Sequence, residues 1–275
     1  MATWFLLLLL LPLAQGWGPE GHYIICAIAQ DRLTSSALTS VARLLPESNK
    51  TLANWCFWAD QVKYLYPWSS ALHHLYTPDV CNFQYNRDCH DENGVKDRCV
   101  VSAISNYTNQ LLSSSSPPTY NLTQALLFLS HFMGNVHQPL HVGFASDIGG
   151  KTINVTWYTT KTDLHHVWDT DLITTQEQRY YQGSIKDLIT GLQKSITSEW
   201  ADLVTGWEMC NKSTIPCPDI YASESIKAAC DWAYKDVYQG ANLSDPYFLT
   251  RRPIVNLKLA QAGVRLAATL NRIFM

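Results

Sequence analysis

Charged side chains are scarce in this 275-residue sequence. They make up 16% of it, where an ordinary soluble domain has about 25%. Its 20 lysine and arginine residues stand against 23 aspartate and glutamate residues, so the formal net charge is −3. Because no stretch carries an excess of positive charge, a basic side-chain platform for nucleic acid is excluded. The 47% apolar and 12% aromatic content excludes disorder as well.

Long hydrophobic runs are also scarce. The one extended run, residues 4–14, falls short of the roughly 20 residues that span a bilayer. Small residues follow it, which indicates a signal peptide over residues 1–16 and a mature chain that starts at Trp17 without a membrane anchor. A buried first helix is the alternative interpretation. Six N-x-S/T sequons independently indicate glycosylation in the secretory pathway, hence a secreted or vacuolar protein: Asn49, Asn106, Asn121, Asn154, Asn211 and Asn242.

The cysteines lack the spacing of a thiolate zinc site. All eight lie after residue 16, and an even number in an oxidising compartment predicts disulfides. The sequence alone does not choose among the many possible pairings. A metal in this protein should therefore be held by nitrogen and oxygen.

Strand patterns are rare, and helical periodicity dominates. Apolar residues recur at steps of three and four over residues 185–207 and 255–273. Pro19 suits the first turn of an initial helix, and the alternation over residues 152–157 predicts one arm of a small hairpin. Without repeats or a composition shift, we expect a mainly α, single multi-helix domain over residues 17–275 with small β-hairpins.

What the sequence does have is nine histidines, several of them near carboxylates. Residues four apart share a helix face, so such pairs can offer two ligands to one cation; the pairs are His131 with Asn135, His137 with His141, and His165 with Asp169. Seven zinc-competent side chains accumulate in this way: His22, Asp60, His73, His131, His141, His165 and Asp169. Zinc ions that activate water and neutralise a leaving oxyanion suit phosphodiester hydrolysis, and they would supply the positive charge that the side chains lack.

Five segments carry a specific family resemblance: residues 17–22, 58–61, 72–73, 129–141 and 164–169. They resemble the zinc-dependent nucleases of the S-one/P-one type, most closely the plant bifunctional nucleases, over essentially residues 17–274. The resemblance implies a helical fold shared with bacterial zinc phospholipase C and a centre of three zinc ions. It also implies cleavage of single-stranded DNA and RNA to 5′-phosphates, with removal of 3′-phosphates from nucleotides as a second activity. We expect a monomer.

The resemblance also implies residue roles. The first zinc would be bound by Asp60, His73, His131 and position 135. The second would be bound by the α-amine and carbonyl of Trp17, which cleavage after Gly16 frees, with His22 and position 135. A more exposed third would be bound by His141, His165 and Asp169. Asp60 and Lys63 would serve catalysis, and Lys63, His74 and Tyr76 would contact substrate. His137 has no assigned metal, so we expect it to be structural or to support a ligand. The implied disulfides are Cys26–Cys56, Cys81–Cys230, Cys89–Cys99 and Cys210–Cys217.

Three positions depart from the family pattern. Asn135 replaces an aspartate that bridges two zincs, so one compensating negative charge is missing. Lys63 replaces an arginine, which keeps the charge and loses the bidentate fork; a solvated surface lysine is the other interpretation. His74 and Tyr76 replace an aromatic residue and an Asp or Asn in the base pocket, where stacking remains feasible. Two alternative functions follow: a catalytically weakened glycoprotein, favoured by Asn135, and a phospholipase C-like phosphodiesterase.

Overall fold

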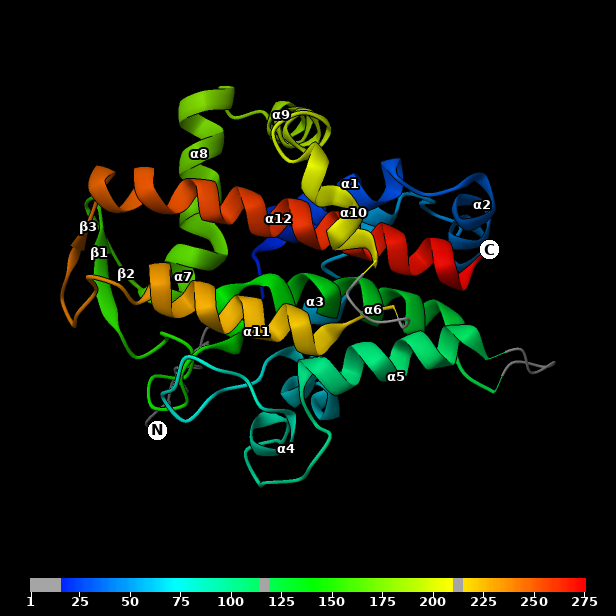
Figure 1. Ribbon diagram of the computed structural model, residues 1–275, viewed down its shortest axis with the longest axis horizontal. Helices are drawn as coiled ribbons and strands as arrows, with labels where there is room; N and C mark the ends of the chain where they lie inside the picture. The colour runs from blue at the N-terminus through cyan, green and yellow to red at the C-terminus, as the bar shows by residue number, and fades with distance from the viewer. Residues whose placement is uncertain (1–15, 114–118, 210–214) are drawn as a thin grey trace, which may run out of the picture.

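The computed structural model describes residues 16–113, 119–209 and 215–275. As predicted, the fold is mainly helical (Figure 1). The α-helices are α1 (Pro19–Asp31), α2 (Ser35–Leu44), α3 (Trp58–Gln61), α4 (Tyr85–Asp88), α5 (Val100–Leu112), α6 (Leu122–His137), α7 (Leu164–His166), α8 (Leu172–Tyr181), α9 (Ile185–Thr197), α10 (Ala201–Met209), α11 (Pro218–Ala228) and α12 (Asp245–Ile273). Shorter helical turns are η1 (Leu52–Trp55), η2 (Pro67–His73), η3 (Pro139–Val142), η4 (Val167–Asp171) and η5 (Ala229–Ala233).

The long helix α12 runs along most of the molecule, and the other helices are arranged around it (Figure 1). It packs against α1, α6 and α10, while α5 packs along α6. The helix begins ten residues before the predicted periodic segment and includes Pro253. The small sheet lies at one end of the molecule (Figure 1).

Helix α6 is the central helix of the core. Every residue from 125 to 137 is buried, as expected of a helix that is hydrophobic all round. The Asn121 side chain caps its start by accepting a hydrogen bond from the Gln124 amide. The helix ends just before Pro139, since proline disfavours helical conformation at the preceding residue. His131 and Asn135 are thereby fixed on one side of a rigid, buried element.

A close approach brings α1 to α6. A Cβ atom at Gly134 would lie 2.8 Å from two atoms of the His22 ring, so the glycine makes the room that this imidazole occupies. Helix α1 begins at Pro19, as predicted, and its buried face includes His22. The packing of the two helices therefore delivers a histidine from the start of the chain to the side of His131.

The predicted hairpin is present, with an unpredicted third strand. Strand β1 (Asn154–Trp157) pairs antiparallel with β2 (Thr160–Asp163). Strand β3 (Asn242–Leu243) joins the other side of β1 in parallel. Two residues are too few to show an alternating sequence pattern, which explains why this strand was not foreseen.

The segment over residues 185–207 is helical, as its periodicity indicates, but it forms two helices. The chain breaks into α9 and α10 at Ser198, whose φ of −125° and ψ of −80° end the first helix. The break resets the helical phase, and Leu203, which belongs to the apolar repeat in the sequence, is 51% exposed. Hydrophobic spacing alone does not reveal such an interruption, because steps of three and four continue across it.

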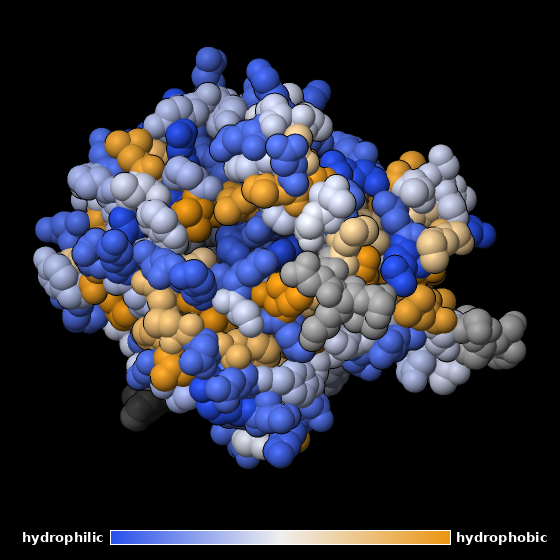
Figure 2. All heavy atoms as spheres, viewed as in Figure 1, coloured by the Kyte–Doolittle hydropathy of each residue, from blue (hydrophilic) through white to orange (hydrophobic). Residues whose placement is uncertain are grey.

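Three of the implied disulfides are formed: Cys26–Cys56, Cys81–Cys230 and Cys89–Cys99. Cys217 is also disulfide-bonded, and Cys210 lies outside the described residues. Hydrophilic residues cover most of the face shown in Figure 2, with small hydrophobic patches between them. In the described ranges, no helix combines the length and hydrophobicity needed to cross a bilayer.

Candidate metal centre and active site

The first group of candidate ligands gathers side chains from four segments. It consists of His22 from α1, Asp60 from α3, His73 from the end of η2, and His131 and Asn135 from α6. The Asp60 carboxylate lies 3.5 Å from both His73 Nδ1 and His131 Nε2, and these two nitrogens are 3.1 Å apart. Donor atoms of His22, Asp60 and His131 all lie within 4.8 Å of one another. All five side chains are buried.

The second group comes from η3 and the α7–η4 segment. It consists of His141, His165 and Asp169. His165 Nε2 lies 3.1 Å from His141 Nε2 and 3.2 Å from the Asp169 carboxylate. These side chains are 0% to 5% exposed. All three side chains are therefore buried, and the greater exposure expected of a third ion stays a prediction.

The spacing fits metal. Ligand atoms about 2.0–2.1 Å from a tetrahedral ion lie about 3.3 Å apart, and the distances in both groups cluster around that value. His141 Nδ1–H donates to the His73 carbonyl (2.8 Å), and His165 Nδ1–H donates to the Gly149 carbonyl (2.6 Å). Both Nε2 atoms therefore present lone pairs toward each other, and the two lone pairs repel. A cation bound between the two nitrogens removes this repulsion.

His22 gives the second indication of a fit. Both of its ring nitrogens are buried, and within the described residues neither has a hydrogen-bond partner. The Asn135 Oδ1 atom is also buried without a hydrogen-bond partner among the described residues. The side-chain nitrogen of Asn135 lies 3.2 Å from His73 Nδ1. Buried polar atoms normally have partners. An ion bound by one His22 nitrogen and by Asn135 Oδ1 accounts for two of these three atoms, so the residues present fit the zinc that the family resemblance implies.

The electrostatics favour the metal-binding protonation states of the histidines. Burial holds the pKa of His22, His73 and His131 well below its usual value, and neighbouring imidazoles and Lys63 lower it further. Burial also lowers the pKa of His141 to about 4. Neutral imidazole is the form that binds a metal ion.

The carboxyl group of the second ligand group has a raised pKa, whereas the histidine pKa values are lowered. Burial raises the pKa of Asp169 to about 7, despite a hydrogen bond from the Gln138 side-chain amide. A bound cation would return this carboxyl to its charged form. Gln138 was not singled out from the sequence, since its neighbours His137 and His141 carried the recognisable pattern.

Lys63 is part of the centre. Its Nζ lies 2.6 Å from Asp60 Oδ1, and the side chain is 7% exposed. The surface interpretation of Lys63 is therefore wrong, because the short helix α3 turns the residue inward beside Asp60.

His137, by contrast, is structural as predicted: its Nδ1–H donates to the Met133 carbonyl, and Arg265 lies 2.9 Å from its Nε2.

A cavity of about 650 Å³ begins at His74, the residue that follows the ligand His73. His74 and Tyr76 line it, with ring centroids 4.6 Å apart and an interplanar angle of 21°. Its volume suits a nucleotide-sized ligand. Lys151, which the sequence analysis missed, reaches the Tyr76 hydroxyl (3.5 Å), and burial lowers the pKa of its ammonium to about 8. The signal in the sequence that could have pointed to Lys151 is its position directly after the turn residues Gly149-Gly150.

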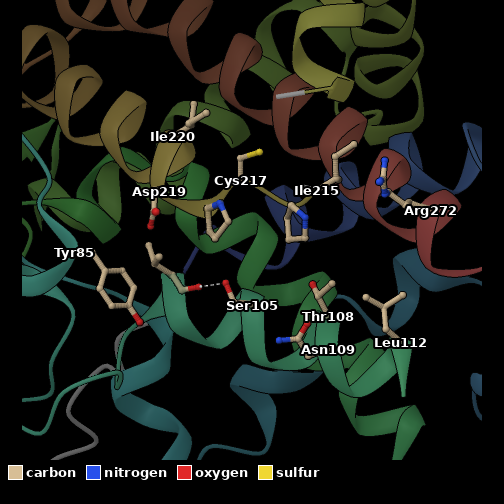
Figure 3. A pocket seen from close by; sticks show the side chains of 13 residues that line it. Tyr85, Ser105, Thr108, Asn109, Leu112, Ile215, Cys217, Asp219, Ile220 and Arg272 are labelled. Carbon is tan, nitrogen blue, oxygen red and sulfur yellow. Dashed lines mark hydrogen bonds between the residues drawn. The ribbon is translucent and has the colours of Figure 1, made fainter. Parts of the chain in front are cut away.

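A second cavity of about 630 Å³ lies between α5 and the start of α11 (Figure 3). Tyr85 and Asp219 stand at one end of it and Arg272 at the other. The described residues that line it include no histidine. It is therefore separate from the candidate metal centre.

Together, the helical fold and the paired ligand groups have the donor set of a metal-dependent hydrolase. Residues 17–275 match the family model described as S1/P1 Nuclease. The chain is 59% identical over 268 residues to Endonuclease 2 of Arabidopsis thaliana, which covers 96% of this chain and 92% of the relative. It is 33% identical to Nuclease S1 of Aspergillus oryzae (97% and 94% covered) and 30% identical to Nuclease P1 of Penicillium citrinum (94% and 97%). The chain belongs to the S1/P1 nuclease family, and it is an endonuclease whose substrates are nucleic acids.

Proposed function

We propose that this chain is a zinc-dependent endonuclease that hydrolyses single-stranded DNA and RNA to products with 5′-phosphates, and that also removes 3′-phosphates from nucleotides. The observation that carries the proposal is the pair of ligand groups with tetrahedral spacing, with a cavity of nucleotide size that begins at His74, next to the ligand His73. Family membership supports the nuclease reaction.

The described ligands would hold three zinc ions. The first would be held by Asp60, His73, His131 and the Asn135 carbonyl. The second would be held by His22, Asn135 and the freed amine and carbonyl of Trp17. The third would be held by His141, His165 and Asp169. When bound, zinc supplies Lewis-acid chemistry, which activates water and stabilises the charge of a leaving oxyanion.

The surrounding side chains position the substrate. The Lys63 ammonium lies 2.6 Å from Asp60 Oδ1, and there it would contact a phosphate oxygen of the substrate. The stacked rings of His74 and Tyr76 offer a flat surface to an unpaired base. A base inside a duplex cannot enter such a cavity, which accounts for a preference for single strands.

The residue before Trp17 lies against ligands of the candidate metal centre. A Cβ atom at Gly16 would lie 1.8 Å from Asn135 Oδ1 and 2.9 Å from His22 Nε2. In the uncut chain, the residue before Trp17 therefore lies against the expected ligands of the second zinc. We propose that cleavage of a 1–16 signal peptide vacates this place and frees the Trp17 amine. The family match begins at the same residue.

Secretion and glycosylation belong to the same proposal. Disulfides in the described residues suit an oxidising compartment, and we propose a secreted or vacuolar monomer. Four sequon asparagines are exposed (Asn106, Asn121, Asn154 and Asn242), and Asn49 is half-buried. Asn211 lies outside the described residues.

The test is turnover on single-stranded DNA with product ends mapped, together with zinc content by elemental analysis. We expect 5′-phosphate ends, activity lost on chelation and restored by zinc, and slower cutting of duplex. A variant that keeps extra residues before Trp17 should lose activity. Full activity of that variant would contradict the role of the amine.

A second candidate is favoured by Asn135, which lacks the charge that two nearby dications require. It is a weakened family member that retains the fold for binding or storage. Three tight zinc equivalents with rapid turnover would exclude it. Assaying lecithin in parallel tests the phospholipase C alternative, and activity on lecithin alone would favour that enzyme class.

A further inference from the structure

A short segment directly after Lys63 carries large apolar side chains that the fold leaves open to solvent. Tyr64, Leu65 and Trp68 are 74%, 58% and 47% exposed. Among the tryptophans in the described ranges, Trp68 is the exposed one. Exposed apolar side chains that occur together, rather than singly, mark interaction sites. The segment is therefore a candidate binding surface.

The fold holds Trp68 in its exposed position. Its ring packs against the rings of Phe128 on α6 and of Tyr66, with centroids 5.7 and 5.9 Å away. The Arg98 guanidinium donates to the Trp68 carbonyl (3.0 Å), and the Ser69 hydroxyl donates to the Tyr66 carbonyl (2.8 Å). Part of the indole is thus fixed against the protein while the rest stays open. A side chain that is already ordered loses little entropy when it binds a ligand.

The segment lies between two parts of the proposed active site. Lys63, directly before Tyr64, lies against Asp60 of the first ligand group. Pro67, directly before Trp68, lines the cavity of about 650 Å³. The exposed side chains are therefore continuous with the ligand group and with the cavity. Nucleotides that flank a bond held at the metal centre would reach them.

The composition of the protein favours stacking as the contact with such nucleotides. The chain has 20 lysine and arginine residues against 23 aspartate and glutamate residues, so side-chain charge alone supplies little attraction for a strand. Aromatic side chains bind successive bases whatever their identity, because every base has a π face. Bases in a duplex are stacked on one another and do not offer these faces.

We propose that Tyr64, Leu65 and Trp68 form a stacking surface for single-stranded nucleic acid, which binds nucleotides of the substrate outside the cavity and the metal centre. The inference rests on the proposed function and extends the substrate contact along the strand. Because the contact is with base faces, it should not depend on base identity. It should matter only for strands longer than the active site itself.

The experiment compares two substrates of the processed, zinc-loaded protein: the thymidine dinucleotide and a thymidine strand of about twelve nucleotides. The dinucleotide has a single phosphodiester bond and occupies the metal centre and the cavity alone. Trp68→Ala should raise KM for the long strand by about tenfold, while KM for the dinucleotide and both kcat values stay within about twofold of the wild type. Tyr64→Ala should raise KM for the long strand by about threefold, and Trp68→Phe should keep it near the wild-type value.

The matched control removes an exposed tyrosine elsewhere. Tyr238, which is 70% exposed, lies just ahead of β3, at the end of the molecule that holds the sheet (Figure 1). Tyr238→Ala should leave KM for both substrates unchanged. The salt dependence of KM for the long strand should be the same in Trp68→Ala as in the wild type, because a stacked base displaces no counterions from phosphate.

Two results would overturn the proposal. One is an unchanged KM for the long strand in both Trp68→Ala and Tyr64→Ala. The other is an equal rise of KM for both substrates, which would mean that the substitutions act through the cavity or the fold. Absence of any cleavage by the wild type would instead count against the proposed function. Fluorescence anisotropy of a labelled long strand then decides the stacking surface separately, since equal affinities of the wild type and Trp68→Ala contradict it.

Discussion

The two ligand groups differ in how firmly the protein holds them before an ion arrives. In the second group, backbone carbonyls orient both imidazoles, and Gln138 holds the carboxylate. In the first group, a backbone carbonyl, that of Cys56, orients His131, whereas His22 has no hydrogen-bond partner in the described structure. The second group is preorganised by the fold, and the first depends more on the ion to complete it.

The two ligand groups also differ in the negative charge that they offer to each proposed ion. Each group offers one carboxylate among its described ligands, Asp60 in the first and Asp169 in the second. The first group must serve two proposed ions with that single charge, because position 135 is an amide. Repulsion between neighbouring dications is therefore less compensated there. The first group should be the weaker point of the centre.

The largest expected effect comes from removing either carboxylate. Asp60→Asn should lower turnover on single-stranded DNA by about a thousandfold, and Asp169→Asn by about a hundredfold, because the first group loses the charge for two ions. Turnover and zinc content should be measured together. Asp202→Asn, an exposed change on α10, is the matched control. Equal losses at the two sites would contradict the contrast.

Acid should destabilise the chelated protein. The depressed histidine pKa values mean that the folded state binds fewer protons than the unfolded state, so stability is present above pH 6.5 and is lost as pH falls toward 4. His141 alone contributes roughly 3 kcal/mol on this basis. Asp169, with its raised pKa, acts in the opposite sense and loses stability as pH rises toward 7. Because the histidines are more numerous than Asp169, the net effect is a loss of stability as the pH falls.

Thermal melting of chelated protein between pH 7 and 4.5 measures this effect. The melting temperature should fall steadily with pH, and His141→Gln should flatten the fall. Added zinc should raise the melting temperature most at pH 7, since protons compete with zinc for the imidazoles. A melting temperature independent of pH would refute the assignment of buried, neutral histidines.

Restoring the missing charge should have a smaller effect. Asn135→Asp should tighten zinc binding at the first group by roughly tenfold and raise turnover when zinc is limiting. Zinc titration followed by activity is the measurement. Asn109→Asp on the exposed side of α5 supplies the same chemical change away from the site. Unchanged affinity and turnover would mean that the amide already serves both ions.

The ligands could be predicted from the sequence because they lie in short, specific motifs. His131 and Asn135 share a helix face by spacing alone, and the buried helix α6 confirms that placement. The break at Ser198 and strand β3 could not be predicted, because one depends on a single backbone angle and the other on pairing between distant segments. Lys151 was missed for the same reason: only the folded turn brings it to Tyr76.

The smallest expected effect tests how the first group meets the phosphate. Lys63→Arg should raise turnover by less than about tenfold, because a guanidinium can contact two phosphate oxygens at once, while Lys63→Gln should lower it. The 2.6 Å contact with Asp60 makes both changes local to the first group, so zinc bound by the second group should stay constant. If arginine slows the reaction as much as glutamine does, the space beside Asp60 is shaped for lysine, and the departure at position 63 is an adaptation of this chain.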